Sequence, residues 1–337
     1  MRRFALLLLA ALAGPTAASA QSFDSQDWQV VCDNTRTCRA AGYSPAGSDA
    51  PVSVLFSRAS GPGRPVYVEL QLGTLDARSQ RPGSVTMTIA GKPAGTIRLD
   101  KNNHADLTSV AATALLKALA GGDGATFTAG KASWRLSGAG AVDMLQKMDE
   151  LQGRAGRPSA LVRKGTLNDA DVASPMAVPR FDGSRIPLVP QAGDDALAVR
   201  VLASIQSQAD CPLLDDGPSQ AKAHLWHLDA NRLLVSQPCR AAAGDGDAGR
   251  GYWTANLRPP YAAKPMTYSG TDYDGSGTIT ERLPGAGAGD CGSAQAWTWN
   301  GFRFEQTYVA TSGLCRGVKA GGAWELPSLV SDVVAGQ

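Results

Sequence analysis

The sequence carries little charge and contains no run of lysine or arginine. Charged residues make up 18% of its 337 positions, and 32 basic side chains stand against 30 acidic ones. Arg2 and Arg3 are the only charged residues among the first 20 positions, so the rest of the chain is neutral. A neutral chain without basic clusters lacks the attraction to phosphates on which nucleic-acid binding depends. The composition therefore argues against nucleic acid as a partner.

The sequence also lacks the common signatures of catalytic and metal sites. It has three histidines, no C-x-x-C pair and no G-x-S-x-G nucleophile motif. His224 and His227 lie three residues apart in a segment that reads as a strand, so they are expected on opposite faces. We therefore expect no metal and no cofactor. An envelope hydrolase with an unrecognised site remains an alternative, because catalytic partners can meet in space only.

The apolar run at the N-terminus, from Phe4 to Ala13, is too short to span a bilayer, which takes about 20 apolar residues. It follows two arginines, breaks at Pro15 and leads to the small residues Ala18-Ser19-Ala20. This order is typical of a secretion signal. We predict a signal peptide over residues 1–20, no membrane span after cleavage, and a periplasmic or secreted protein.

Six cysteines follow the predicted signal, which is an even number in a chain expected to leave the reducing cytoplasm. Fifteen pairings are possible in principle. The cysteines fall into three couples of near neighbours along the chain, and short loops are the least costly to close. The predicted disulfides are Cys32–Cys38, Cys211–Cys239 and Cys291–Cys315.

Residues 21–165 are expected to form an N-terminal β-rich domain with two helices. Short alternating segments bounded by Gly, Pro and Ser indicate strands, and residues 27–43 predict the first hairpin. Residues 107–120 have apolar positions at helical spacing. A strand over residues 125–136 leads to a second helix, for which Ser137 is the expected N-cap.

The rest of the chain divides into a linker and a second domain. Residues 166–195 contain four prolines and no sustained periodicity, so they predict a linker, and residues 196–337 predict a C-terminal disulfide-bonded β domain. The expected class is α+β, mostly β: two small antiparallel β-rich domains, the first with two helices packed on its sheet. Residues 21–165 carry 17 basic and 12 acidic side chains, and residues 166–337 carry 13 and 18. Opposite net charges can favour docking of the two domains.

The clearest hairpin signal lies in residues 294–308, where an Asn-Gly dipeptide favours a two-residue turn. In that register Trp299 opposes Phe302 and Trp297 opposes Phe304, which places four aromatic rings on one face of the sheet. An exposed face of this kind can bind a glycan or a partner protein, although such a face more often belongs to a core. Trp297 and Trp299 are candidate interaction residues.

Four segments resemble a bacterial envelope family known as domain of unknown function 1176. They are residues 28–43, 148–165 and 289–304, and the Cys315–Gly317 segment with Trp324 after it. The N-terminal part is also similar to the invasion-associated locus B group, which shares an early Trp and a close cysteine pair. The resemblance implies an exported protein with a small β-rich domain at its N-terminus and indicates no activity.

A basic cluster follows the second predicted helix and includes Arg154, Arg157, Arg163 and Lys164. It can receive an anionic ligand. Basic residues beyond a helix C-terminus are also favourable through the helix dipole alone.

Three further motifs are weak. Residues 271–281 match the first part of an EF-hand loop, but Leu283 stands where its last ligand belongs, so a turn with solvated aspartates is expected. Residues 287–292 satisfy G-x-G-x-x-G but precede a strand rather than a helix. Ser269 to Tyr273 is similar to half of the S-G-x-x-Y signature of lysozyme inhibitors, which makes Tyr273 a candidate interaction residue.

These observations favour an uncharacterised exported envelope protein that acts as a non-enzymatic binding or interaction module. Its partner is unknown, and an envelope protein is the candidate. A lysozyme-inhibitor-like periplasmic protein is one alternative, and an envelope hydrolase is the other.

We expect the exported protein to contain no free thiol and three local bridges. Alkylation without reduction, followed by peptide mapping, tests this expectation. A labelled cysteine, or a bridge from Cys32 to the C-terminal half, contradicts the pairing.

Overall fold

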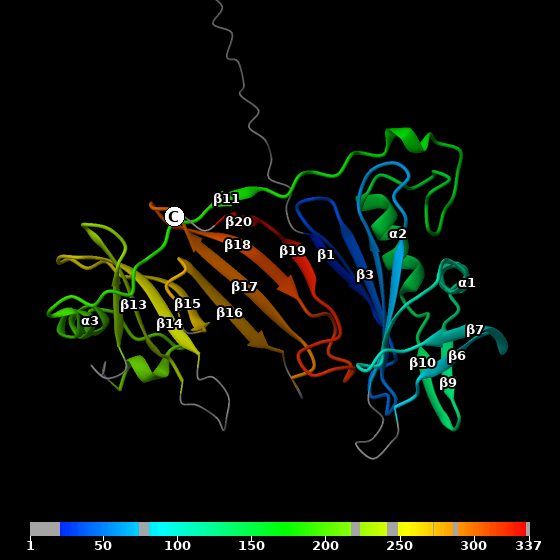
Figure 1. Ribbon diagram of the computed structural model, residues 1–337, viewed down its shortest axis with the longest axis horizontal. Helices are drawn as coiled ribbons and strands as arrows, with labels where there is room; N and C mark the ends of the chain where they lie inside the picture. Colours follow the sequence, from blue (N-terminus) through cyan, green and yellow to red (C-terminus); the bar gives the residue numbers. More distant parts are fainter. Residues whose placement is uncertain are drawn as a thin grey trace, which may run out of the picture.

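The structure is a computed structural model, and it describes residues 21–73, 81–216, 223–240, 249–271, 273–285 and 289–334. The predicted α+β, mostly β class is confirmed. Two β-rich halves lie side by side, and a long extended segment connects them along one edge (Figure 1). The expected signal peptide lies outside the described residues.

The N-terminal half is built on a six-stranded antiparallel sheet in the order β1-β2-β3-β4-β5-β8. Its strands are β1 Gln21–Ser25, β2 Trp28–Cys32, β3 Cys38–Tyr43, β4 Val52–Arg58, β5 Tyr67–Leu72 and β8 His104–Asp106. The predicted first hairpin is β2 and β3. Sequential hairpins place neighbouring strands beside each other up to β5, and the chain then leaves the sheet before returning as β8.

The excursion before β8 starts a second, four-stranded sheet in the order β10-β9-β6-β7. Its strands are β6 Ser84–Ile89, β7 Lys92–Arg98, β9 Ala125–Ala129 and β10 Ala132–Leu136. Residues 125–136 are therefore a hairpin rather than the single predicted strand. Gly130 forms its turn with a φ of 58°, which favours glycine.

Two helices complete this half, α1 Ser109–Ala120 and α2 Ala141–Leu151. The Thr108 hydroxyl caps α1 by accepting a hydrogen bond from the Ala111 amide at 3.3 Å. Helix α2 starts after Gly140 and not after the predicted cap Ser137, whose hydroxyl instead accepts from the Ala139 amide. A Cβ on Gly140 would lie 2.0 Å from the Ser25 carbonyl oxygen, so this approach of the chain requires glycine.

The main core lies between the two sheets and the two helices. Alternate residues of β2, β3, β4 and β5 point into it, together with the apolar faces of α1 and α2. Among its largest fully buried side chains are Trp28, Trp134, Phe56, Phe127, Leu70, Leu72 and Met87. This inner face fixes the register, because a shift of one residue would turn the apolar set outward.

The predicted linker is largely extended, and it is anchored at several points. It contains the 3-10 turn Asp169–Asp171 and the strand β11 Arg180–Asp182, which pairs in parallel with β20 Asp332–Val334 near the end of the chain. Ile186 is fully buried in a core cluster of the C-terminal half. The Met176 amide donates to the Thr35 carbonyl of the other half at 3.1 Å. The segment thus contacts both halves that it joins.

The C-terminal half is an eight-stranded antiparallel meander in sequence order from β12 to β19. The strands are β12 His224–His227, β13 Arg232–Pro238, β14 Arg250–Asn256, β15 Lys264–Gly270, β16 Thr278–Pro284, β17 Gly292–Trp299, β18 Phe304–Thr311 and β19 Leu326–Leu329. Helix α3 Asp194–Ala203 packs against β12 and β13, and the 3-10 turn Pro212–Leu214 follows it. Each strand pairs with the next along the chain, so the half is built from local contacts.

The β17–β18 hairpin is present, but its predicted register is wrong. Trp299 opposes Phe304, and Trp297 opposes Gln306. The Asn300 side chain accepts hydrogen bonds from the Phe302 and Arg303 amides at 2.8 and 2.9 Å, which closes a four-residue loop instead of a two-residue turn. Phe302 is therefore at the tip of the loop.

The structure contains the three local disulfides Cys32–Cys38, Cys211–Cys239 and Cys291–Cys315. The first joins directly opposed residues at the end of the β2–β3 pair. The second joins the turn after α3 to the end of β13. The third joins the start of β17 to the segment after β18.

The two halves meet through the outer face of the six-stranded sheet. Val31, Ala41, Tyr43 and Leu55 form an apolar patch there, and residues 313–326 of the C-terminal half cover it with Val318, Trp324 and Leu326. We call residues 313–326 the covering segment. The Trp324 indole donates to the Ser53 hydroxyl at 2.6 Å, and 8% of the Trp324 residue is exposed. One aromatic side chain thus supplies both apolar burial and a buried hydrogen bond.

An ion pair also crosses between the halves, from Arg316 to Asp27 at 3.0 Å. Its cation belongs to the half with the negative net charge and its anion to the half with the positive net charge. Local packing and hydrogen bonding therefore describe this contact better than the overall charge of the two halves.

Among the described residues, no helix has the length and apolar character to cross a membrane.

We expect Trp324→Ala to lower the free energy of unfolding by about 3–5 kcal/mol, the usual cost of a buried aromatic truncation. If the halves fold separately, calorimetry should also show two transitions in place of one, with faster proteolysis within residues 166–195. Phe302→Ala is the matched control and should change stability by less than about 0.5 kcal/mol. Equal losses in the two variants contradict this account of the interface.

Candidate functional site

A polar cleft of about 440 Å³ lies between the outer face of the six-stranded sheet and the covering segment. Its charged lining residues are Arg39, Glu69, Asp100, Lys319 and Glu325. Trp324 forms part of the wall next to the buried apolar patch. The cleft therefore brings titratable groups from both halves together beside their interface.

Glu69, His104 and Asp106 form a compact group on this face. Glu69 on β5 lies directly opposite Asp106 on β8, and His104 is two residues before Asp106 and so shares its face. The His104 Nε2 atom is 3.2 Å from a Glu69 carboxylate oxygen. One potential ligand atom from each of the three residues lies within 4.8 Å of the other two. The group thus offers one imidazole nitrogen and two carboxylates to the same point.

The position of His104 is fixed by the turn before it. Asp100 accepts hydrogen bonds from the Asn102 and His104 amides at 2.7 and 2.9 Å, and these bonds lower the pKa of its carboxyl group. The His104 ring also meets the Trp324 ring edge-on, with centroids 6.1 Å apart. The imidazole is therefore held between Glu69 and the interface tryptophan.

A second hollow, of about 480 Å³, lies beside the tip of the β17–β18 hairpin. We call it the hairpin groove. Trp299, Phe304 and Met266 line it with apolar surface, and Phe302 at its edge is 78% exposed. The aromatic face predicted from the sequence is thus divided: Trp299 is 2% exposed, Trp297 is half-buried, and Phe302 lies in solvent.

Cations surround the hairpin groove. Arg232, Lys264 and Arg303 line it, and none of the described lining residues is acidic. The Arg232 guanidinium lies over the Trp299 ring, 4.9 Å from its centroid. Arg232 also pairs with Asp229, which lies outside the lining.

The predicted basic cluster does not form one surface. Arg154 is 0% exposed, and its guanidinium donates to Gln152, Ser159 and the Gly61 carbonyl. Arg157 donates to the Gly153 and Asn168 carbonyls. Arg163 and Lys164 are exposed. Arg154 and Arg157 are thus engaged in bracing the chain after α2.

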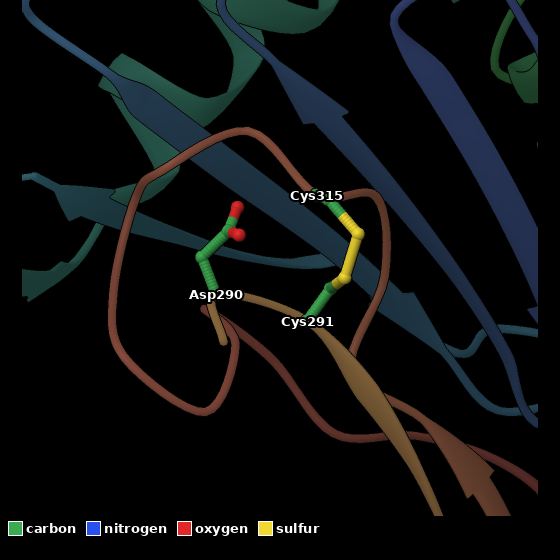
Figure 2. Close-up of side chains that lie close together, drawn as sticks. All are labelled: Asp290, Cys291 and Cys315. Carbon is green, nitrogen blue, oxygen red and sulfur yellow. A yellow bond between two sulfur atoms is a disulfide. The ribbon is translucent and has the colours of Figure 1, made fainter. Parts of the chain in front are cut away.

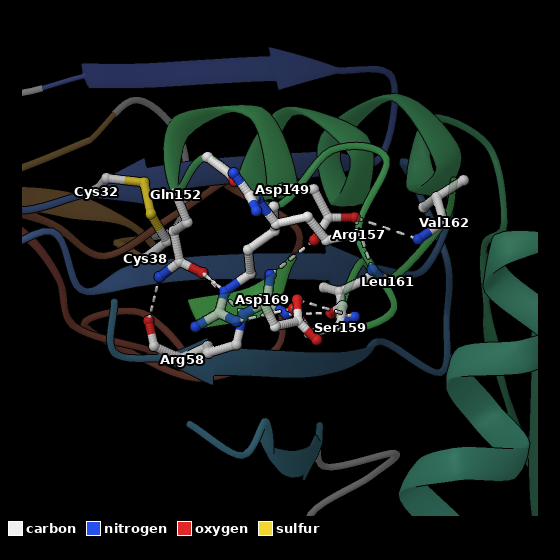
Figure 3. Close-up of polar contacts among 12 residues, drawn as sticks. Cys32, Cys38, Arg58, Asp149, Gln152, Arg157, Ser159, Leu161, Val162 and Asp169 are labelled. Atoms are coloured by element: carbon white, nitrogen blue, oxygen red, sulfur yellow. Dashed lines mark hydrogen bonds and ion pairs between the residues drawn. A yellow bond between two sulfur atoms is a disulfide. The ribbon is translucent and has the colours of Figure 1, made fainter. Parts of the chain in front are cut away.

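This bracing belongs to a buried polar network around Arg58 and Asp149 (Figure 3). Arg58 donates to Asp149 at 2.7 Å and to Gln152 at 2.7 Å, and both ion-pair side chains are 1% exposed. Asp149 also accepts from the Leu161 and Val162 amides at 2.6 and 3.2 Å. Burial lowers the pKa of Arg58, and the hydrogen bond that Arg58 donates to the Asp149 carboxylate opposes this effect. The network joins β4, α2 and the loop after α2.

Tyr273 lies in a core cluster of the C-terminal half with Trp226 and Trp299. Its hydroxyl donates to the Ile186 carbonyl at 3.2 Å and accepts from the Gly277 amide at 2.8 Å. Burial raises the pKa of Tyr273 to about 12. The candidate interaction residue is therefore turned inward, where it fixes the linker against the sheet.

The weak motifs lie partly outside the described residues. In the EF-hand-like stretch, Asp274 accepts from the Ser276 amide at 2.8 Å, and Asp272 lies outside the described residues. Gly287 of the glycine motif lies outside them as well.

Asp290 and Cys291, which belong to that motif, lie close to Cys315 (Figure 2). Both sulfur atoms belong to one disulfide, so they offer no thiolate to a metal. Asp290 accepts from the Gly317 amide at 2.5 Å and so holds the loop that follows Cys315. A structural role accounts for this group.

His224 and His227 point to opposite faces of β12, as the strand prediction requires. His227 lies 3.0 Å from a carboxylate oxygen of Asp194, the first residue of α3. His224 is exposed, and its ring packs edge-on against Trp226 at 5.7 Å.

The model of the family described as "Protein of unknown function (DUF1176)" matches residues 22–331, which is nearly the whole chain. The chain belongs to the DUF1176 family. No curated protein and no solved structure matches it. For this DUF1176 protein, function must therefore be inferred from its own geometry.

The Glu69–His104–Asp106 group gives no signal in the DUF1176 chain's linear sequence. Glu69 and His104 are 35 residues apart, and only the pairing of β5 with β8 joins them. The alternating His-Ala-Asp of β8 shows that two of the groups share a face, but not which strand lies opposite.

In this DUF1176 protein we expect Arg58→Met to lower the free energy of unfolding by about 3–5 kcal/mol, because it leaves the Asp149 carboxylate buried without its cation. Asp149→Asn should then cost less in the Arg58→Met background than in the original protein. Denaturant titration of the four proteins measures this coupling. The exposed pair Lys147–Glu150, 3.6 Å apart, is the control and should couple by less than about 1 kcal/mol. Additive losses at Arg58 and Asp149 contradict the assignment.

Proposed function

We propose that this chain is a non-enzymatic interaction module of the bacterial envelope that binds an acidic segment of a partner protein in the hairpin groove. The observation that carries the proposal is Phe302, a large apolar side chain that is 78% exposed beside a hollow lined by cations. Phe302 adjoins the apolar lining formed by Trp299, Phe304 and Met266, so these side chains form a patch rather than a single exposed residue, and such patches mark interaction sites.

The composition of the groove supports protein binding. Aromatic and arginine side chains dominate the binding energy of protein interfaces, and the groove combines Trp299, Phe302 and Phe304 with Arg232 and Arg303. The groove is hollow on one side of the hairpin tip, so an apolar anchor of a partner can enter it while Phe302 packs on the partner.

The charge of the groove indicates an acidic partner. Arg232 and Arg303 form local ion pairs with Asp229 and Glu305, whose carboxylates do not line the hollow. The three cations therefore present their charge to the groove and the two acids lie behind it. A carboxylate in the partner can pair with Lys264, the first residue of β15, which also lines the groove.

Export belongs to the same proposal. The predicted signal peptide over residues 1–20, the three disulfides and membership of the DUF1176 family all fit an oxidising compartment, either the periplasm or the outside of the cell. The similarity of residues 21–165 to the invasion-associated locus B group is consistent with this localisation.

A photo-cross-linking residue at position 302 tests the groove in living cells. We expect one defined envelope protein to be captured from position 302 and not from position 67, where Tyr67 is 66% exposed on the other half. The partner, once identified, should bind the purified protein at least about 10-fold more weakly after Phe302→Ser, because central aromatic residues contribute 1.4 kcal/mol or more.

Charge reversal gives the second arm of this experiment. Arg303→Glu should weaken binding of the identified partner and remove most of its salt dependence, whereas Tyr67→Ser should leave the affinity unchanged. Equal capture from positions 302 and 67, or an affinity that Phe302→Ser does not change, contradicts the proposal.

A further inference from the structure

Two carboxylates lie directly opposite each other on the outer face of the N-terminal half. Glu69 and Asp106 are paired residues of β5 and β8, and both side chains leave the sheet on the same side. Like charges in directly opposed positions destabilise a sheet. Among the described residues, no lysine or arginine nitrogen lies within 4.0 Å of either carboxylate. The repulsion therefore lacks a compensating side-chain cation from lysine or arginine.

His104 supplies a third donor beside these carboxylates. Its Nε2 atom is 3.2 Å from a carboxylate oxygen of Glu69, and the His104 amide donates a hydrogen bond to the Asp100 carboxylate. The cleft has two other basic residues: Arg39 on β3 of the same sheet is paired with Asp33 at 2.8 Å, and Lys319 belongs to the covering segment on the other side. The three donors converge from two paired strands, whose backbone is fixed by the sheet, rather than from separate loops.

We infer that Glu69, His104 and Asp106 bind a divalent cation, and that this cation is Zn²⁺. One imidazole and two carboxylates match the ligands that Zn²⁺ takes, whereas Ca²⁺ and Mg²⁺ select sites made of oxygen alone. Three protein ligands leave one position of a tetrahedral ion open, and two of these ligands, Glu69 and His104, line the polar cleft. The ion neutralises the opposed carboxylates, which no lysine or arginine in the described part of the chain does.

The site acts on the contact between the halves as well. His104 is a ligand on one side and meets the Trp324 ring on the other, and Trp324 is the main side chain of the covering segment. A bound ion fixes the imidazole ring that Trp324 packs against. Zn²⁺ is therefore expected to stabilise the docked arrangement of the two halves.

Calorimetric titration of the purified, metal-stripped protein with Zn²⁺ tests this inference, with Ca²⁺ and Mg²⁺ titrated in parallel. We expect one saturable Zn²⁺ site and no comparable binding of the other two ions. His104→Gln and Asp106→Asn should each weaken Zn²⁺ binding at least about 10-fold, since even indirect partners of a metal ligand contribute that much. His224→Gln is the matched control, because His224 is an exposed histidine on the other half, and should bind as the original protein does.

Thermal unfolding of Asp106→Asn gives an independent readout. Without metal, this variant should melt at or above the temperature of the original protein, because one of two opposed charges is gone. With saturating Zn²⁺ the order should reverse, because the ion then stabilises the original protein more. Absence of saturable Zn²⁺ binding, equal loss in His224→Gln and His104→Gln, or an unchanged melting order with and without Zn²⁺ overturns the assignment. Phe302→Ser should retain full Zn²⁺ binding. Failure of the zinc site can therefore be distinguished from failure of the proposed binding in the hairpin groove.

Discussion

The outer face of the six-stranded sheet is apolar at its centre and must be covered, and the rest of the architecture follows from this requirement. Its inner face already packs on two helices and a second sheet, so cover for Val31, Ala41 and Leu55 comes from the C-terminal half. The covering segment follows β18 and leads into β19, and it therefore ties the end of an eight-stranded meander to the first hairpin of the chain. Where its packing ends, the polar cleft begins, and Glu69 and His104 line that cleft with Asp106 next to them.

Local features of the fold could be predicted from the sequence, because their physical cause is local. Helix α1 has its apolar stripe and its Thr108 cap within 13 residues, and each disulfide joins the nearest cysteines. The register of the hairpin after Trp299 differs from the predicted one because the Asn300 side chain, rather than the Asn-Gly backbone, closes the loop. For the same reason Phe302 belongs to the loop tip instead of a sheet face.

Non-local features could not be predicted in this way. The chain leaves the first sheet after β5, builds the β6–β7 hairpin in another sheet, and returns to pair as β8. Nothing in residues 69 or 104 specifies that return, so the candidate metal site appears only when the strands are paired. Arg154 is a further example. The sequence places it in an exposed basic cluster after a helix, but in the structure it is buried and donates hydrogen bonds to Gln152, Ser159 and Gly61.

The covering segment is synthesised after the sheet that it covers. The N-terminal half leaves the ribosome, and any export channel, before residues 313–326 are available. In that interval Tyr43, Leu55 and their neighbours lack the side chains that cover them in the complete structure. Transiently exposed patches of this kind are where nascent chains associate wrongly. A chain truncated before Trp324 would keep this patch uncovered. It should therefore depend on chaperones more than the complete chain does.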